Sequence, residues 1–296
     1  MFKNATIYKL GALPDGGIIA AEESMKADEF APCGSSQEKS VGWVCPRGHE
    51  YGAMIESSDG HHFARLAIET KSVPSSELTK HTEARCAEIE ATTGRKPGKK
   101  ERKEIKSDVH MQLLPKAFPK RKDVLVWIDE ANQRIVVDTS SSAVADTVVV
   151  QLARIGFTVL MLNTVQSAGA FMLNTLLGFE DDTVPQNFSL GRECELQALD
   201  ESKARATFKN HPLDGDDVCD HIKQGKSVTK LGLCTANASF VMSDSMVLKK
   251  IDLIWEESKS EDDDAFDADV FVTTKVLGDA ITNLIASLGG ELEVEA

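Results

Sequence analysis

The stretch from Arg95 to Lys122 reads RKPGKKERKEIKSDVHMQLLPKAFPKRK and gathers a large share of the positive charge of the chain. Eleven of its residues are Lys or Arg and three are Asp or Glu, so it carries +8. The whole chain of 296 residues carries −14, which leaves −22 for the remainder. Positive charge confined in this way is typical of a surface that meets a polyanion. A solvated helix laced with charges explains the composition equally well.

Prolines and apolar spacing divide this part of the chain into elements. Pro74 stands before two serines that can cap a helix, and Pro115 stops a helix that precedes it. Ile105, Val109 and Leu113 follow one another at intervals of four residues, which predicts one apolar helix face. We therefore expect a protruding helical hairpin over residues 75–114, with a basic tip and a basic second helix.

Composition limits the class of protein. The apolar fraction of 42% is enough for sizeable cores. No apolar run approaches the roughly 20 residues of a membrane span, and the N-terminus lacks the pattern of a secretion signal. The six cysteines include no C-x-x-C pair, which is typical of reduced thiols in a cytoplasmic protein. We expect a cytoplasmic protein without membrane contact.

The order of predicted elements indicates an α+β fold with antiparallel sheets and flanking helices. We expect an N-terminal α+β part (1–72), the helical hairpin with the basic segment (73–122) and a C-terminal α+β part (123–296). In the last part, alternation predicts a buried strand over Phe157–Leu162 and a strand over Ala268–Thr274. An acidic loop over Glu256–Asp264 precedes the latter strand, and a helix over Val276–Leu288 follows it.

The sequence offers little for catalysis or metal binding. The run from Gly94 to Lys100 is one residue too short for a phosphate-binding loop and lacks the Ser or Thr that holds magnesium. The spacing of five Cys and His residues matches no common zinc pattern, namely that of Cys33, Cys45, His49, His61 and His62. We predict no catalytic residue, no metal and no cofactor.

One acidic cluster supports a weaker alternative. Asp262–Asp264, Asp267 and Asp269 could hold magnesium for phosphodiester cleavage. A run of adjacent aspartates is more often a solvated loop, because its charges repel one another. A magnesium-dependent nuclease therefore stays an alternative hypothesis.

Phe118 lies between Pro115 and Pro119, and Lys120, Arg121 and Lys122 follow it. A rigid, exposed aromatic residue there can anchor a partner or stack on a base. The alternative is a phenylalanine that caps the preceding helix and packs on its own core.

Short motifs match a known family in the same order along the chain. They are Phe2-Lys-Asn4, Phe30-Ala-Pro-Cys-Gly34, Gly42-Trp-Val44, Leu113-Leu-Pro-Lys-Ala-Phe118, Trp127-Ile-Asp129, Phe188-Ser-Leu-Gly191, His221-Ile, Gly225-Lys226, Lys230-Leu, Phe266-Asp-Ala-Asp269 and Leu288-Gly-Gly290. On these residues the chain resembles the bacterial RdgC family of recombination-associated proteins.

The resemblance implies a homodimer closed into a ring whose positively charged hole encircles double-stranded DNA. It implies binding without sequence preference, functional competition with RecA recombinase, a nucleoid-associated location and no catalytic activity. Phe118 takes the place of the family's dimer-contact phenylalanine. Lys116 stands where the family usually has an arginine, and Lys209 matches a DNA-contacting position of the family. Asn210 and His211 differ in type from the family pattern there.

From charge and resemblance together we predict a set of DNA-contacting residues. They are Lys99, Lys100, Arg102, Lys103, Lys116, Lys120, Arg121, Lys209 and His211. Lysine-rich surfaces suit phosphates better than base edges, so backbone contacts without sequence readout are expected. The second hypothesis is a protein–protein adaptor in which the basic hairpin docks on an acidic partner.

Overall fold

The computed structural model describes residues 2–49, 51–178, 187–254 and 263–292. Within them the chain folds as α+β around one twelve-stranded antiparallel sheet, ordered β2-β4-β5-β6-β1-β12-β11-β10-β8-β9, with β3 paired to β4 and β7 to β1. The strands are β1 (Asn4–Ala12), β2 (Lys39–Val44), β3 (Ile55–Ser58), β4 (His61–Lys71), β5 (Pro119–Asp129), β6 (Arg134–Val137), β7 (Thr158–Met161), β8 (Ser189–Ala198), β9 (Arg205–Lys209), β10 (Lys226–Cys234), β11 (Ala238–Ser243) and β12 (Leu248–Leu253). The helices are α1 (Gly17–Ala27), α2 (Ser75–Thr93), α3 (Lys99–Leu113), α4 (Ser142–Arg154), α5 (Ala168–Leu177), α6 (Asp216–Lys223), α7 (Asp263–Val272) and α8 (Gly278–Ser287).

Alternation along the strands builds a core on each face of the sheet. On β4, Phe63 belongs to the core that contains residues of α5 and α8, whereas Ala64 and Leu66 belong to the core with residues of α1 and α4. Phe63 stacks on Trp127 of β5 with ring centroids 6.1 Å apart. Each face of the continuous sheet is therefore covered by its own hydrophobic core.

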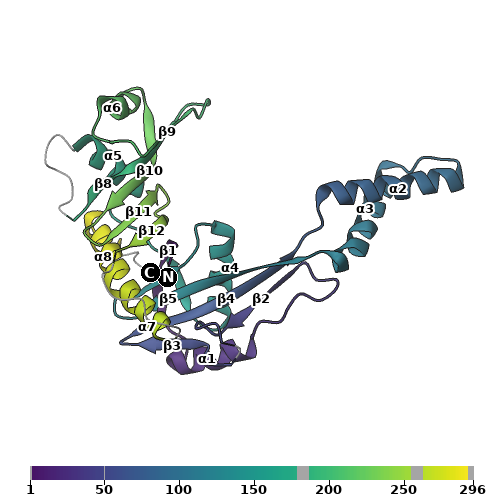
Figure 1. Ribbon diagram of the computed structural model, residues 1–296, viewed down its shortest axis with the longest axis horizontal. Coiled ribbons are helices and arrows are strands. Elements are labelled where there is room, and N and C mark those ends of the chain that lie inside the picture. The colour runs from purple at the N-terminus through teal and green to yellow at the C-terminus, as the bar shows by residue number, and fades with distance from the viewer. Residues whose placement is uncertain (1, 50, 179–186, 255–262, 293–296) are drawn as a thin grey trace.

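The arm, defined as residues 75–113 of α2 and α3, projects far from this body (Figure 1). The long antiparallel pair β4–β5, in register from His61↔Asp129 to Lys71↔Pro119, leads out to it. α2 and α3 pack against each other, with Ile105 and Val109 of α3 buried as the four-residue spacing predicts. The arm therefore has a small apolar seam and a large solvated surface.

The opposite end of the molecule carries the tip of β8 and β9 together with α6, so the two ends diverge from the central part around β1 and α4 (Figure 1). β1 joins them, because it pairs with β6 on one side and with β12 through Asn4↔Lys249 and Ala5↔Leu248.

Two sequence predictions in the C-terminal part are wrong. Ala268–Thr274 is not a strand: α7 runs through Val272 and passes into a π-helical turn over Thr273–Leu277. Burial of Val272 and Leu277 in the core overrides the β-branched composition of this segment. The strand β7 exists but is not buried, since Leu160 is 48% and Met161 72% exposed. Most of the predicted acidic loop, residues 256–264, lies outside the described residues.

Candidate nucleic-acid interface

The first group of candidate residues lies on α3 of the arm. Lys99, Lys100 and Lys103 are exposed and have no ion-pair partner in the part of the chain that the structure describes. Arg102 differs, because its Nη2 lies 3.5 Å from Glu83 Oε1 of α2. Hydrogen bonds from Arg95 lower the pKa of Glu101. Arginines of the arm thus hold carboxylates, whereas these lysines are available to an outside anion.

The segment after the arm has an anchored backbone and exposes the Phe118 side chain to solvent. Leu114 is buried, and the amide of Ala117 donates to its carbonyl oxygen over 3.1 Å. Phe118 follows at once and is 90% exposed. The alternative that this ring packs on its own core is therefore wrong. Lys116 is exposed beside it on the short 3₁₀ turn Leu114–Lys116.

Strand alternation separates Arg121 from its neighbours Lys120 and Lys122 on β5. Arg121 donates from Nε and Nη2 to Asp123 over 2.7 and 3.2 Å, and its guanidinium lies 4.7 Å from the Phe30 ring centroid. Lys122 extends from the other face and donates to Thr139 Oγ1 over 3.3 Å. The predicted basic run is thus divided between two faces of the sheet.

Lys209 lies at the other end of the molecule, in what we call the lysine cavity. This hollow of about 370 Å³ on β8–β12 is lined by Glu193, Cys194, Glu195, Thr207, Phe208, Lys209, Lys230, Val241, Lys249 and Lys250. Strand register assembles it, because Glu193 lies opposite Lys209, Glu195 opposite Lys230 and Val241 opposite Lys249.

The four lysines of this cavity fall into two pairs. Lys230 Nζ lies 2.9 Å from Glu195 Oε2, and Lys250 Nζ lies 2.6 Å from Glu193 Oε1. The hydrogen bond from Lys230 is the main cause that lowers the pKa of Glu195. Lys209 and Lys249 have no ion-pair partner among the described residues, so their ammonium groups are free to meet a phosphate.

Sequence reasoning found Lys209 but missed Lys249. Lys249 of β12 lies about forty positions from Lys209 of β9 along the chain. Only the strand order β12-β11-β10-β8-β9 places both residues on one sheet. The signal in the sequence was the pair Lys249-Lys250 within an alternating strand, which does not itself indicate a partner.

His211 lies in the turn after β9 and contacts residues of its own chain. Its Nδ1 donates to the Pro212 carbonyl oxygen over 2.5 Å, and its Nε2 lies 3.4 Å from Asp217 of α6. Its ring lies against Phe208, with centroids 5.4 Å apart. Asn210 has φ of 52°, and its carbonyl oxygen accepts from Arg192. Both residues shape the turn after β9 rather than line the lysine cavity.

The structure does not bring the possible metal ligands together. The Cys33 thiol donates a hydrogen bond to the Glu69 backbone carbonyl oxygen, and the His62 ring lies between Ser57 and Glu130. Within the described residues no group of three or more His, Cys, Asp or Glu side chains could hold a metal ion. Of the aspartate cluster, Asp267 is ion-paired with Arg47 at 2.7 Å, while Asp262 lies outside the described residues.

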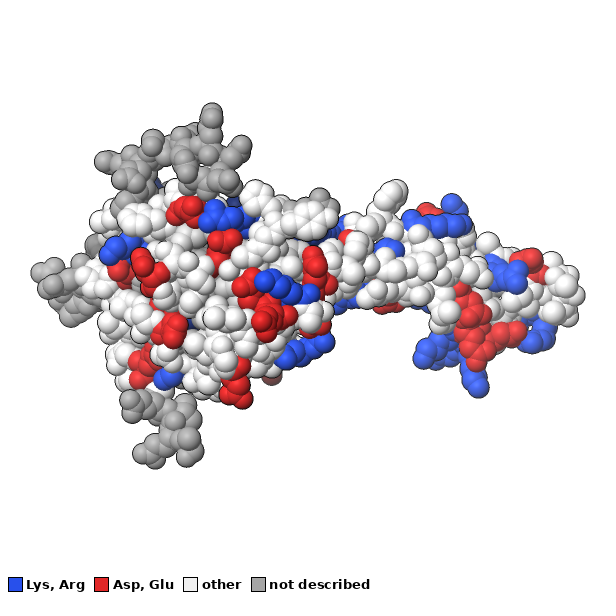
Figure 2. Space-filling model, turned by 90° about the horizontal axis from the view of Figure 1, so that it is seen from below, with Lys and Arg blue, Asp and Glu red and all other residues white. Residues whose placement is uncertain are grey.

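Acidic and basic side chains intermingle on the face seen in Figure 2, both over the body and along the arm. The excess negative charge of the chain is therefore not one continuous patch on this face. Among the described residues, no helix has the length and apolar character needed to cross a membrane.

Comparison with known proteins places this geometry in a family. The sequence profile described as "Putative exonuclease, RdgC" matches residues 1–291. The chain is 36% identical over 302 residues to the Recombination-associated protein RdgC of Janthinobacterium sp. (strain Marseille), covering 99% of each chain. It is 37% identical over 303 residues to that of Herminiimonas arsenicoxydans, covering 98% of each. The chain belongs to the RdgC family.

Membership in the RdgC family confirms the resemblance drawn from the short motifs. The profile spans the arm, the Phe118 segment and the lysine cavity alike, so all three lie within the RdgC match. The names in the family differ in emphasis: the RdgC relatives are named for recombination, and the profile is named for an exonuclease.

Proposed function

We propose that the protein binds double-stranded DNA without sequence preference, encircles it as a ring-shaped homodimer and restrains recombination by RecA. One observation carries the proposal. Lysines without ion-pair partners among the described residues occur at both ends of the molecule, on α3 of the arm and in the lysine cavity. The RdgC relatives, named for recombination, support DNA as the polyanion.

The chemistry of these surfaces suits the phosphate backbone. Duplex DNA carries one negative charge per about 1.7 Å of its axis, and lysines that neutralise phosphates release counterions. Lysine is a flexible point charge, and it lacks the rigid fork with which arginine reads guanine. Arg102 and Arg121 hold carboxylates of their own chain, which leaves lysines as the principal contacts.

Phe118 supplies the contact between copies. An aromatic ring that is 90% exposed on an anchored backbone is a suitable core for a small interface. Closure at Phe118 would place the basic arms of two copies next to each other. RecA would then be restrained because the ring occupies the DNA on which RecA assembles.

A salt titration tests the DNA part of the proposal. The affinity of the full-length protein is measured on two unrelated duplexes of equal length between 50 and 300 mM salt. We expect a linear fall of log K with log salt, and equal affinities within about threefold, because phosphate contacts dominate. A flat dependence, or a strong preference for one duplex, would refute the proposal.

The name of the family profile favours exonuclease activity as a second candidate. End-labelled duplex is incubated with the protein and magnesium and is then run on a denaturing gel. We expect full-length DNA, whereas progressive shortening would establish a nuclease. If the DNA neither shifts in a native gel nor shortens, the adaptor hypothesis replaces both.

The effect on recombination is measured separately, in a RecA strand-exchange reaction titrated with the protein. We expect inhibition that follows the fraction of duplex covered. Inhibition by a variant that no longer binds DNA would show direct contact with RecA and would contradict restraint by occupation.

A further inference from the structure

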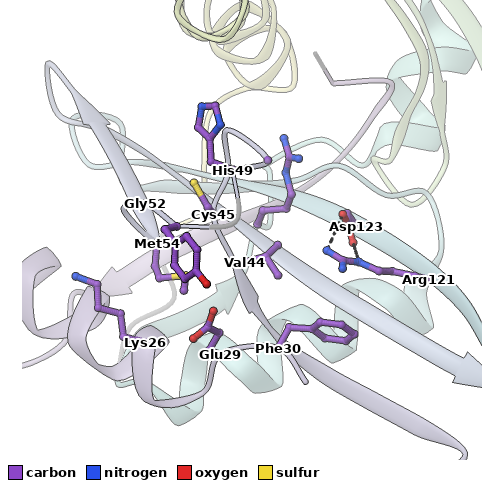
Figure 3. Close-up of a pocket in the computed structure, with 13 residues that line it drawn as sticks. Lys26, Glu29, Phe30, Val44, Cys45, His49, Gly52, Met54, Arg121 and Asp123 are labelled. Carbon is purple, nitrogen blue, oxygen red and sulfur yellow. Dashed lines mark hydrogen bonds and ion pairs between the residues drawn. The ribbon is translucent and has the colours of Figure 1, made fainter. Parts of the chain in front are cut away.

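A second cavity lies away from the lysine cavity, beside β2, β4 and β5 at the base of the arm. It measures about 520 Å³ and is lined by the end of α1, the loop after β2 and residues of the three strands (Figure 3). We call it the Arg65 cavity. None of the predicted DNA-contacting residues except Arg121 takes part in it.

Arg65 is the distinctive residue of this cavity. It lies within β4, opposite Val44 of β2 and Leu125 of β5, and is half-buried. Among the residues that the structure describes, its guanidinium has no hydrogen-bond or ion-pair partner. A half-buried guanidinium without a partner gains from an anion, which it can bind through two parallel hydrogen bonds.

The other charges of the cavity are already engaged or lie apart. Arg121 is held by Asp123 and by the Phe30 ring, and Lys26 is paired with Glu22 at 2.8 Å. Glu29 is an unpaired carboxylate in the described chain, but it lies near Lys26, at the end of the cavity away from Arg121 (Figure 3). The lining therefore contains three cations and two carboxylates, with Arg65 the cation still to be neutralised.

The walls leave room for an apolar body beside the charge. Val44, Cys45 and Met54 contribute apolar side chains to the lining. Two glycines keep the loop close: a Cβ at Gly52 would lie 2.9 Å from Cys45 Sγ, and one at Gly48 would lie 3.7 Å from Arg65 Nη1. The positive φ of 85° at Gly48 allows the turn that brings the backbone against the guanidinium.

We propose that the Arg65 cavity binds a small organic anion, a phosphate monoester or a carboxylate attached to an apolar or planar body. The head of this ligand bonds to the Arg65 guanidinium, and its body lies against Val44 and Met54. A cavity of about 520 Å³ is in the range of ligand pockets in proteins. Apart from Arg121, the site shares no lining residue with the predicted DNA contacts.

Calorimetric titration of the full-length protein without DNA tests the proposal. The probes are phenyl phosphate and phenylacetate, which both carry a phenyl ring but differ in the anionic head group. Inorganic phosphate tests the head group without a ring, and benzyl alcohol tests the ring without a charge. We expect one or both charged ring compounds to bind with a dissociation constant below about 1 mM. The separate head and body should bind at least about tenfold more weakly, and the stronger ring compound identifies the preferred head.

Three variants locate the binding. Arg65→Gln should weaken the preferred probe at least about tenfold, since a charge-assisted pair is lost. Arg85→Gln, an exposed arginine of the arm paired with Glu88, should leave binding unchanged. Val44→Phe fills the cavity while the charge remains, and it should also abolish binding. Unaltered melting temperatures establish that the variants are folded. Failure of both charged probes to bind, or equal binding by Arg65→Gln, would overturn the proposal.

Discussion

Glu193 and Glu195 form ion pairs with two of the four lysines in the lysine cavity. Each binds one lysine, so in the proposed DNA complex Lys230 and Lys250 would offer less charge than Lys209 and Lys249. Because the pKa of Glu195 is lowered from its ordinary value of 4.5, the folded state binds its proton less readily. The stability from this ion pair is therefore present above pH 4.5 and is lost only as pH falls through the lowered value. DNA binding near neutral pH should not vary through this pair.

Lys249 provides the sharpest test at the level of single residues. Lys249→Gln should weaken DNA binding severalfold and lower the slope of log K against log salt by about 0.9, because one phosphate contact disappears. The matched control is Lys223→Gln, an exposed lysine of α6 already paired with Asp220. Salt titrations of the two variants make the measurement. Equal slopes for both variants would exclude Lys249 from the interface.

Cysteine reactivity reports on the core beneath the same cavity. Burial raises the pKa of Cys194 to about 12, so at pH 8 nearly all of this group is the unreactive thiol. We expect iodoacetamide to modify the half-buried Cys86 and Cys219 well before Cys194 in the native protein. Peptide mass spectrometry against time gives the order. Early modification of Cys194 would show that β8 is not packed as described.

Elements with strong local signals were predictable from sequence. The helix predicted over Val276–Leu288 is confirmed in α8, Gly278–Ser287, and Pro74 and Pro115 lie next to the ends of the helical segments of the arm. The segment Ala268–Thr274 was mispredicted because Val270, Val272 and Thr273 favour strands locally, while packing against the core decides in favour of a helix. The sequence contained no local sign of that contact.

The candidate sites were predictable only where they are local. The basic stretch and Phe118 lie in one segment and were found directly. The Arg65 cavity draws on residues from Lys26 to Asp123, and its central residue is a lone arginine within the apolar stretch Phe63–Ile68 of β4. Only the register of β2, β4 and β5 brings these residues together, and no spacing along the chain encodes that register.

The proposed dimer contact at Phe118 predicts that self-association depends on this one side chain. Phe118→Ala should weaken self-association at least about tenfold, since a buried aromatic anchor typically contributes 2 kcal/mol or more. Its fold should persist, because the ring makes little contact with its own chain. Sedimentation at several concentrations measures the association. Met111→Ala, which removes an exposed apolar residue of α3, is the control. Parent-like association of the Phe118 variant would exclude this contact.

At the scale of the whole molecule, encirclement makes a prediction that simple electrostatic binding does not. A closed ring leaves a linear duplex by sliding off an end but must open to leave a circle. After a jump to high salt, we expect longer retention on nicked circular DNA than on the same DNA cut once. Retention is measured by gel filtration of the complexes. Equal loss from both forms would contradict a ring.

The pairing of β1 with β12 also bears on how the molecule folds. β1 is made first, yet its partner β12 begins at Leu248, so the two-residue pairing Asn4↔Lys249 and Ala5↔Leu248 closes almost the longest loop in the chain. Contacts so distant along the sequence form late, because closing a long loop costs conformational entropy before the new contacts can stabilise the structure. The half that includes β2, β4, β5 and β6 can assemble during synthesis, whereas the two ends take up their final angle only when the C-terminal strands arrive. A nascent chain would thus be unable to form the proposed ring before β12 has been synthesised.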